Sequence, residues 1–446
     1  MSKNILNFLV PALLIAVSAS LTNAQPYKLS FQENRERAAG VFHYYEYVPS
    51  PQTPAPKGFK PFYISHYGRH GSRYHSGAGY FGPALKGLDT CRADGLLSPE
   101  GERLWQQLDT LFSEHQGMFG MLTERGAQEH RAIGRRLLEY APEVFRGKKG
   151  RNEIDAVSSY WPRCLVSMAN FTTALQERTN GLVFHYATGP KYLDYISMNL
   201  NMDGVTRRYN SFVATLEAAK VPYDRFFSAL FSNPQLALER IPDPEGFMRS
   251  VFESGCISPN TEHRPDIFSH FTDDELAGEW ILHNDKLYYR YGISAEEGDI
   301  VRAIAKPLIA DIVARADEAV RPGSRRAADL RFGHDVGLLP LIGTIGIQGM
   351  ERPFPSADVH THWFSFEMIP MASNLQMIFY RNRKGDILVK LRYNEQETTI
   401  PALQTATGPY YRWEDLRAYL VRTETEIPGD RVVRDSAQTE RNGTRY

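Results

Sequence analysis

Two arginines and a histidine lie within five residues in the segment Arg69-His70-Gly71-Ser72-Arg73. A guanidinium offers forked donors that match phosphate oxygens, and an imidazole can act as a nucleophile. Gly71 allows the backbone to turn sharply or to approach a ligand beside the ring. These residue types favour transfer of a phosphoryl group, and a basic surface loop is the alternative interpretation.

The same arrangement, a short strand followed soon by a charged or imidazole side chain, occurs at two further places. Residues 155–159 are predicted as a strand, and Arg163 follows in the first turn of a helix. Residues 329–332 are predicted as another strand, with His334 and Asp335 directly after it. The carboxyl ends of neighbouring parallel strands meet at one edge of a sheet. If these strands are neighbours, two imidazoles, three guanidiniums and one carboxylate share a pocket.

Hydrolysis of a phosphomonoester needs the groups that this pocket would contain. A nucleophile attacks phosphorus, cations hold the equatorial oxygens, and an acid protonates the leaving alkoxide. Asp335 is the candidate acid, and an N-cap of the following helix is its alternative or additional role. The chemistry requires no cofactor and no metal, so we expect neither.

Helix signals on either side of these loops are well defined. Ser98 and Thr123 are predicted N-caps of two helices. Ser294 with Glu297 is predicted as a capping box for a long helix that reaches residue 320 and is interrupted at Pro307. Strands alternate with these helices, which favours an α/β fold with a central sheet.

The fold class that we expect is α/β, with a mixed central sheet flanked by helices and a mostly helical inserted domain. Helical patterns separated by Pro and Asn clusters dominate residues 164–293, which we interpret as the insert. The core domain would then comprise 25–163 and 294–435, and the polar residues 436–446 would form a flexible tail.

The first 24 residues have the composition of a cleavable secretory signal. Lys3 precedes an apolar stretch over 5–17, and small residues follow up to Ala24. We therefore expect a secreted or periplasmic protein whose mature chain begins near Gln25. The chain has 51 Lys and Arg against 52 Asp and Glu, so its global charge does not favour nucleic acid or a membrane surface as a partner. The oligomeric state is left open.

Cysteines and a second histidine cluster offer two further hypotheses. Cys91, Cys164 and Cys256 allow at most one disulfide, and Cys91 with Cys256 is the pair to test against buried free thiols. A strand over residues 358–362 would aim Asp358, His360 and His362 at one face, which is a candidate metal site. A metal-dependent hydrolase is therefore one rival function, with structural or rim histidines as the alternative for His360 and His362.

Two motifs resemble those of a known family. Arg69-His70-Gly71-Ser72-Arg73 resembles the Arg-His-Gly-x-Arg signature of the histidine phosphatase superfamily, and Phe332-Gly333-His334-Asp335 resembles the His-Asp motif of its acid phosphatase and phytase branch. The segments Leu122-Thr123-x-x-Gly126 and Leu338-Leu339-Pro340-Leu341 are similar to the same branch, including its multiple inositol polyphosphate phosphatases. The resemblance extends from about residue 60 to residue 395.

The resemblance implies a role for each residue of the predicted pocket. His70 would be the nucleophile and form a phosphohistidine intermediate. Asp335 would protonate the leaving group and then act as the base that activates water. Four side chains would hold the phosphoryl oxygens: Arg69, Arg73, Arg163 and His334.

The resemblance also implies a small-molecule phosphomonoester as the substrate, including inositol polyphosphates such as phytate. His334-Asp335-Val336 departs from the His-Ala-Glu of the animal inositol polyphosphate phosphatases, so a general acid phosphatase for sugar or aryl phosphates is the alternative. A substrate with many phosphates needs further cations, and Arg383-Lys384 at a predicted hairpin tip between strands 375–381 and 387–393 is one candidate source. A polyanion-binding protein without catalysis is the rival from another class.

Overall fold

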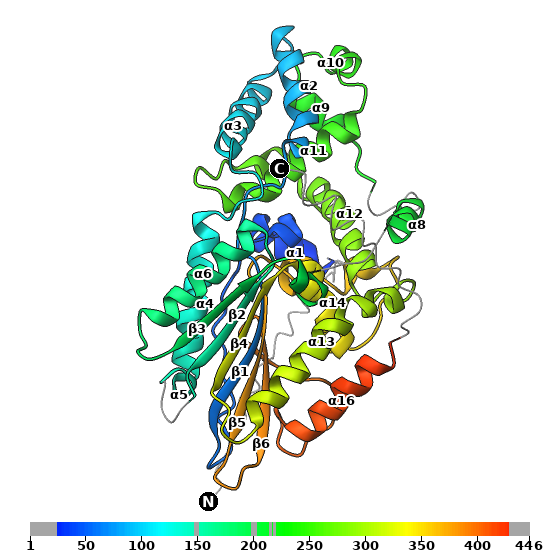
Figure 1. Cartoon of the computed structure of the whole chain (residues 1–446). Helices are drawn as coiled ribbons and strands as arrows, with labels where there is room; N and C mark the ends of the chain where they lie inside the picture. Colours follow the sequence, from blue (N-terminus) through cyan, green and yellow to red (C-terminus); the bar gives the residue numbers. More distant parts are fainter. Residues whose placement is uncertain (1–24, 147–150, 198–202, 214–215, 217–219, 428–446) are drawn as a thin grey trace, which may run out of the picture.

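The computed structural model describes residues 25–146, 151–197, 203–213, 216 and 220–427. The predicted signal over 1–24 and the predicted tail over 436–446 lie outside the described residues. A central mixed sheet has the strand order β3-β2-β4-β1-β5-β6-β7, and β8 pairs with β6. The expected α/β class with a mixed central sheet is confirmed (Figure 1).

The strands of the sheet fall into a parallel half and an antiparallel half. The order β3-β2-β4-β1 is parallel throughout, and β5, β6 and β7 add antiparallel strands beside β1. The strands are β1 (Lys60–Arg69), β2 (Glu153–Ser158), β3 (Val183–Thr188), β4 (Arg326–Gly333), β5 (Asn374–Arg381), β6 (Ile387–Tyr393), β7 (Gln396–Thr398) and β8 (Tyr410–Arg412).

The register of the parallel half brings three strand ends together. Arg69 at the end of β1 pairs with Gly333 at the end of β4, and Ser158 at the end of β2 pairs with Phe332. The three loops that follow β1, β2 and β4 therefore leave the same edge of the sheet. This confirms the expectation that the three strands are neighbours.

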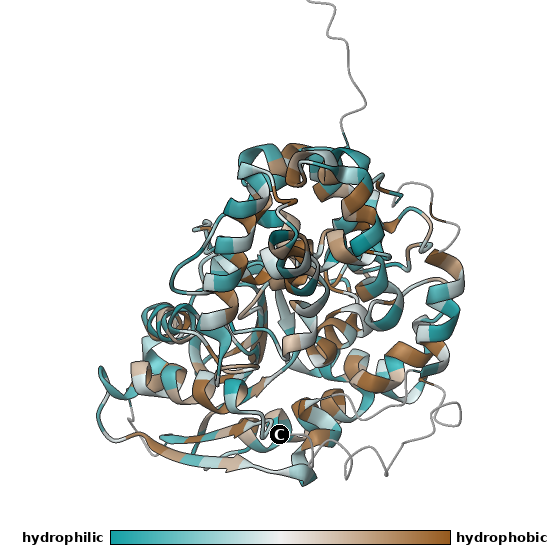
Figure 2. Cartoon of the chain, turned by 90° about the horizontal axis from the view of Figure 1, so that it is seen from above, coloured by the Kyte–Doolittle hydropathy of each residue, from teal (hydrophilic) through white to brown (hydrophobic). Residues whose placement is uncertain are grey.

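Helices cover both faces of the sheet. One face packs against α4 (Glu124–Tyr140), α5 (Pro142–Phe145) and α6 (Pro162–Gln176) through a core that includes Ile133, Phe171 and Leu330. The other face packs against α13 (Gly298–Val320), α14 (Asp335–Ile345) and α16 (Trp413–Thr425). Apolar and polar residues alternate along these ribbons (Figure 2), as expected for helices with one buried face.

The predicted helix starts are borne out in part. Ser98 accepts a hydrogen bond from the Gly101 N–H and Thr123 accepts one from the Gly126 N–H, so both are N-caps as expected. Ser294 Oγ accepts from the Glu297 N–H, but α13 begins only at Gly298. The predicted interruption at Pro307 is wrong, because α13 continues through it. Burial of one whole face of α13 outweighs the single backbone hydrogen bond that a proline removes.

A second body of helices, which we call the cap, lies above the edge where β1, β2 and β4 end (Figure 1). It has its own apolar core, which includes Leu104, Phe226, Phe247 and Trp280. Its helices are α2 (Gly82–Ala93), α3 (Pro99–His115), α9 (Asp224–Leu230), α10 (Pro234–Arg240), α11 (Pro244–Ile257) and α12 (Asp273–Tyr291). The remaining helical elements are α1 (Pro26–Glu33), η1 (Arg35–Phe42), η2 (Ala78–Tyr80), η4 (Pro190–Tyr192), α7 (Leu193–Ile196), α8 (Asp203–Val213), η6 (Ser258–Asn260), η7 (Ile267–His270), η8 (Val359–Thr361) and α15 (Ser365–Met368).

The predicted boundaries of the helical insert need two corrections. Residues 164–188 were expected in the insert, but α6 packs on α4 and β3 pairs with β2 in the core sheet. Conversely, α2 and α3 were expected in the core domain, but they pack against α9, α10 and α11 in the cap. β3 gives a weak strand signal because it is an edge strand whose side chains are mostly exposed or half-buried.

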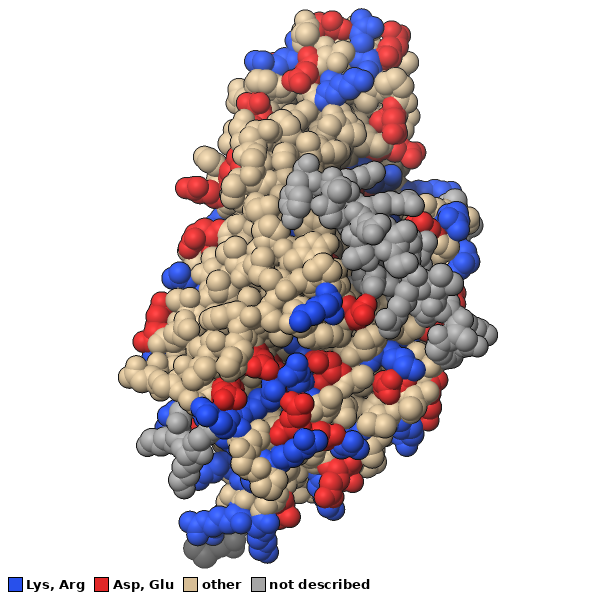
Figure 3. Space-filling model, in the orientation of Figure 1, with Lys and Arg blue, Asp and Glu red and all other residues tan. Residues whose placement is uncertain are grey.

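Of the two alternatives for the cysteines, the structure shows buried free thiols. Cys91, Cys164 and Cys256 are all free and all buried. Among the described residues, no helix is long and apolar enough to cross a membrane. Basic and acidic side chains intermingle on the visible face of the molecule (Figure 3), in keeping with the near-zero net charge.

Candidate active site

The loop after β1 is held firmly at the carboxyl edge of the sheet. The His70 N–H donates to the Gly333 carbonyl at 2.9 Å, which ties the loop to the end of β4. Arg69 Nη1 donates to the carbonyls of Val41 and Ile369, each at 2.7 Å. Arg69 and His70 are almost fully buried. The geometry of this loop is therefore set by backbone contacts from both sides.

The three predicted loops bring their polar side chains into one cluster. The rings of His70 and His334 lie 5.5 Å apart between centroids. Arg163 Nη2 lies 3.5 Å from His334 Nδ1, and Arg69 Nη2 lies 3.3 Å from Asp335 Oδ2. The sixth residue, Arg73, is near enough to shift the titration of both His70 and Asp335. All six residues that the sequence singled out lie together, and their individual roles stay predictions.

The His70 ring is oriented for attack through one nitrogen. Its Nδ1 lies 2.9 Å from the Gly71 carbonyl. A carbonyl only accepts, so the proton must sit on Nδ1, and Nε2 keeps a free lone pair. Burial lowers the pKa of His70 well below 6.5, and the charges of Arg163, Arg69 and nearby groups lower it further. The imidazole is therefore neutral, and nucleophilic, well into acidic solution.

Asp335 is the first residue of α14, and its carboxylate accepts from the Val336 N–H at 3.0 Å. The N-cap residue of this helix is His334, so the N-cap interpretation of Asp335 is wrong. Burial alone would raise the pKa of Asp335, but Arg69, His334 and Arg73 outweigh it and hold the pKa below its usual value. Ser159 Oγ lies 3.0 Å from His334 Nε2 and fixes the plane of that ring.

The guanidiniums of this cluster have donors to spare. The Nε atoms of Arg69, Arg73 and Arg163 are buried and have no hydrogen-bond partner among the described residues. Burial, followed by the charges of Arg163 and Arg69, lowers the pKa of Arg73 to about 9. Crowded buried cations repel one another, and an anion placed between them removes that repulsion. The cluster is thus suited to bind a small dianion.

The sequence did not point to several residues that support the loop. Ser167 Oγ accepts from the Gly71 N–H at 3.1 Å. Glu129 of α4 accepts from both the N–H and the hydroxyl of Ser72, and Asn260 of η6 also contacts that hydroxyl. Glu129 could have been noticed, because it lies on the buried face of an amphipathic helix where a carboxylate needs partners.

Two glycines let α4 approach the loop closely. A Cβ on Gly126 would lie 2.2 Å from the Ser72 carbonyl oxygen, and a Cβ on Gly71 would lie 2.6 Å from the Gly126 carbonyl oxygen. We expect Gly126→Ala to lower the free energy of unfolding by about 1–3 kcal/mol or more and to reduce turnover. Gly82→Ala, where a Cβ meets nothing within 4 Å, is the matched control in urea unfolding. Equal stability of the two variants would contradict this account.

The candidate metal site, the rival interpretation of this segment, does not form. Val359–Thr361 is the 3-10 helix η8 instead of a strand, and His360 contacts Asp285 whereas His362 Nε2 lies 3.9 Å from Asp358 Oδ2. His360 is buried with its Nδ1 2.8 Å from Asp285 Oδ2, whereas His362 is half exposed and stacks on Phe354. In the part of the chain that the structure describes, no group of three or more His, Cys, Asp or Glu side chains could hold a metal ion.

Arg383-Lys384 also lies away from the cluster. β5 runs antiparallel to β1, with Lys60 paired to Arg381 and Gly68 paired to Asn374. The hairpin tip after Arg381 therefore extends past the beginning of β1, at the opposite edge of the sheet from His70. Of the two positions open for this pair, near the pocket or far from it, the structure shows the distant one.

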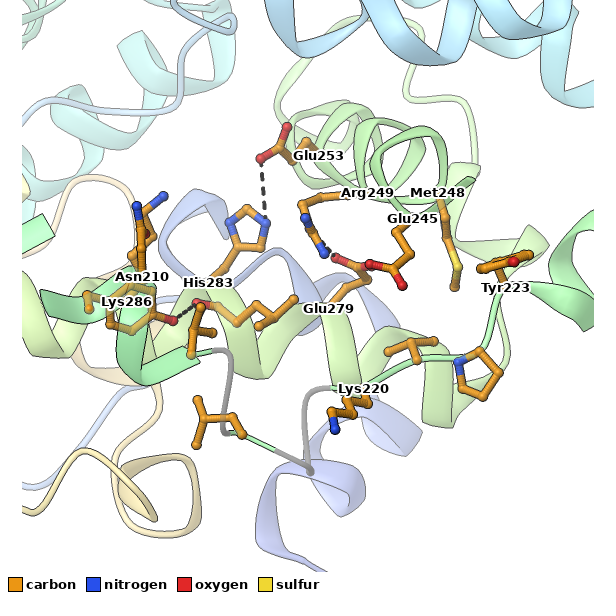
Figure 4. A pocket seen from close by; sticks show the side chains of 16 residues that line it. Asn210, Lys220, Tyr223, Glu245, Met248, Arg249, Glu253, Glu279, His283 and Lys286 are labelled. Carbon is orange, nitrogen blue, oxygen red and sulfur yellow. Dashed lines mark hydrogen bonds and ion pairs between the residues drawn. The ribbon is translucent and has the colours of Figure 1, made fainter. Parts of the chain in front are cut away.

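A cavity of about 580 Å³ lies in the cap between α8, α11 and α12 (Figure 4). On its walls Arg249 contacts Glu279 and His283 contacts Glu253. Lys286 also lines the cavity, and it has no hydrogen-bond or ion-pair partner among the described residues. Arg290 follows one turn later on α12, and its buried Nε likewise has no partner. Tyr291, the next residue, is close enough to Asp335 for that carboxylate to raise its pKa.

Comparison with known proteins finds a family model and a curated relative that resemble this chain. Residues 253–394 match the family described as Histidine phosphatase superfamily (branch 2). Human multiple inositol polyphosphate phosphatase 1 is 23% identical over an alignment 336 residues long, and the match covers 67% of this chain and 65% of that protein. The match thus spans slightly less than two thirds of the human protein's length.

Solved structures share the fold. Multiple inositol polyphosphate phosphatase from Bifidobacterium longum, in complex with inositol hexasulfate, superposes with a TM-score of 0.69 at 21% identity and covers 86% of this chain and 97% of its own. The phytase from D. castellii superposes with a TM-score of 0.66 at 15% identity and covers 93% and 91%. With its two motifs at the ends of neighbouring strands, the chain is similar to the histidine phosphatase superfamily, branch 2, whose family model matches residues 253–394.

Proposed function

We propose that this protein is a phosphoric monoester hydrolase that works through a phosphohistidine on His70 and accepts inositol polyphosphates such as phytate. One observation carries the proposal. A buried imidazole with a free Nε2 lies among three guanidiniums with unused donors, beside a carboxylate. The family and the human relative support the same chemistry.

The reaction has two steps. His70 Nε2 attacks phosphorus, the bond from phosphorus to the ester oxygen breaks, and Asp335 gives its proton to the leaving alkoxide. Water then attacks the phosphohistidine and passes a proton to the Asp335 carboxylate. The bond from phosphorus to Nε2 breaks, and inorganic phosphate leaves. Arg69, Arg73 and Arg163 hold the equatorial oxygens throughout, with His334 as a further donor.

A row of cations on α12 supports a substrate with several phosphates. Lys286 and Arg290 lie one turn apart and form no ion pair with a described residue, and the next residue, Tyr291, is near enough to Asp335 for that carboxylate to raise its pKa. Burial lowers the pKa of Lys286, the Arg290 charge lowers it further, and the Glu253 carboxylate only partly offsets them. A second phosphate on the same molecule would find its counter-charge there.

Parallel assays of phytate and an aryl phosphate test the proposal. Phosphate release is measured in acid with a chelator present. We expect the double variant Lys286→Gln, Arg290→Gln to lower kcat/KM for phytate by about 10- to 100-fold and to leave the aryl phosphate unchanged. Lys86→Gln, on an exposed part of α2, is the control. Equal losses on both substrates would refute the polyphosphate role, and no release from either substrate would refute the phosphatase.

Export is a separate proposal. Lys3, the apolar stretch over 5–17 and the small residues before Gln25 support a signal peptide that directs secretion or a periplasmic location. The N-terminal residue of protein purified from its native host tests this. A mature chain that begins near Gln25 is expected, and an intact N-terminus on most of the protein would refute export with cleavage.

A further inference from the structure

A buried hydrogen-bond network joins the catalytic loop to the core and to the cap. Ser72 lies between His70 and Arg73 and is fully buried, and its N–H donates to Glu129 Oε2 at 2.7 Å. Its hydroxyl lies 2.8 Å from Glu129 Oε1 and 3.0 Å from Asn260 Oδ1. Glu129 belongs to α4 of the core and Asn260 to η6 below the cap, so the three side chains tie three separate segments together.

The number of protons available to Ser72, Asn260 and Glu129 determines which of these side chains must donate each hydrogen bond. Asn260 Nδ2 donates to the Phe42 carbonyl at 2.8 Å, which fixes the amide so that Oδ1 faces Ser72. The Ser72 hydroxyl has one proton and faces two acceptors, Asn260 Oδ1 and Glu129 Oε1. With Glu129 ionised, one of these two oxygens has no proton to share and the contact is repulsive. With a proton on Oε1, Glu129 donates to Ser72 and Ser72 donates to Asn260.

The other partners of Glu129 are compatible with the protonated form. The Tyr45 N–H donates to Oε1 at 3.1 Å, and a carboxylic acid hydroxyl can accept one such bond while it donates its own. Burial raises the pKa of Glu129 from 4.5, and the N–H donors and Arg125 only partly offset this. The charged and titratable groups around it are Arg69 of β1, Arg125 and Arg136 of α4, Arg264 beyond η6, and Tyr45; Arg136 is itself paired with Glu395.

We propose that Glu129 is a positioning residue that holds the catalytic loop while protonated, and that its ionisation breaks the connection from Ser72 to the cap. The protonated acid completes the chain Glu129–Ser72–Asn260, which fixes Ser72 between His70 and Arg73. When Glu129 is ionised, the Ser72 hydroxyl donates its hydrogen bond to the carboxylate, and Asn260 Oδ1 is left without a donor. Loop order, and with it turnover, then declines as pH rises. The effect on turnover rests on the proposed function, whereas the effect on stability does not.

The first test measures stability without reference to activity. A group whose pKa is raised in the folded state binds more protons there, so its contribution to stability is present below its unfolded pKa and is lost as pH rises through the folded pKa. We therefore expect the free energy of unfolding of the wild type, relative to Glu129→Gln, to fall as pH rises above about 4.5. A difference that grows with pH would show that Glu129 works ionised and would overturn the proposal.

The second test uses the pH profile of kcat. Glutamine cannot ionise, so the ratio of kcat for Glu129→Gln to kcat for the wild type is expected to rise severalfold as pH increases. Taking a ratio cancels the titration of Asp335, which is the same in both proteins. Glu139→Gln, exposed on the same helix, is the matched control and should give a flat ratio. A flat ratio for Glu129→Gln as well would refute the link to turnover, and absence of activity in the wild type would refute only the proposed function.

Discussion

Replacement of His70 by alanine is expected to lower kcat by about four to six orders of magnitude. In the proposed mechanism the imidazole supplies the nitrogen that attacks phosphorus, so no covalent intermediate forms without it. The fold should survive, because the side chain makes one hydrogen bond, to the Gly71 carbonyl within its own loop. Phosphate release at saturating substrate measures the loss, and urea unfolding checks the fold.

A control for the His70 variant is available from the second histidine cluster. His362 is half exposed and is the C-cap residue of η8, and no group of three or more His, Cys, Asp or Glu side chains among the described residues could hold a metal ion. We expect His362→Ala to keep wild-type turnover, with or without a chelator. Retained activity in His70→Ala, or loss of activity in His362→Ala, would contradict the histidine mechanism and favour a metal-dependent hydrolase.

Asp335→Asn is expected to separate substrates by their leaving groups. For an alkyl phosphate, kcat/KM should fall by about 10²- to 10⁴-fold, since the alkoxide leaves without a proton. For an aryl phosphate, kcat/KM should change little, because a phenolate is a stable leaving group. The amide can still accept from Arg69, so the ion-pair geometry is roughly kept. Equal losses in kcat/KM on both substrates would contradict the role of Asp335 as the acid.

The same substitution has a consequence for pH dependence. Arg69, His334 and Arg73 hold the pKa of Asp335 below its usual value despite burial. The protonated acid is therefore scarce except in acid, and wild-type kcat/KM for an alkyl phosphate should fall as pH rises. His70 imposes no matching loss on the acid side near pH 6.5, because its own pKa is lowered. In Asp335→Asn the residual kcat/KM for the alkyl phosphate should no longer fall as pH rises through the pKa of Asp335.

The sequence predicts the catalytic cluster because its signals are local. A functional side chain stands at the end of a buried parallel strand, as Arg69 does in β1, or directly after it, as His334 does after β4. If such strands are parallel neighbours, the loops that follow them lie at the same edge of the sheet, so their side chains are expected to lie close together. Arg163 is found in the same way, although it belongs to no sharp motif, because Pro162 marks the helix start after β2.

Features that depend on distant partners could not be predicted. Glu129 and Asn260 come from α4 and η6, and only the tertiary fold brings them to Ser72. The position of Arg383-Lys384 depends on β5 running antiparallel to β1, a choice of neighbour that the hairpin pattern does not contain. In the cap, α2 and α3 pack against α9–α11, which follow them by more than 100 residues in the sequence. Local composition therefore does not indicate where the cap begins and ends.

Trapping the covalent intermediate tests the central claim most directly. In Asp335→Asn an aryl phosphate should still phosphorylate the enzyme, while hydrolysis of the intermediate is slow because its base is missing. An alkaline quench followed by peptide mass spectrometry then locates the phosphate. We predict one phosphate per chain, on the His70 imidazole, and none in the double variant that also carries His70→Ala. Phosphate on another residue, or an unphosphorylated His70 while aryl phosphate is consumed, would contradict the account.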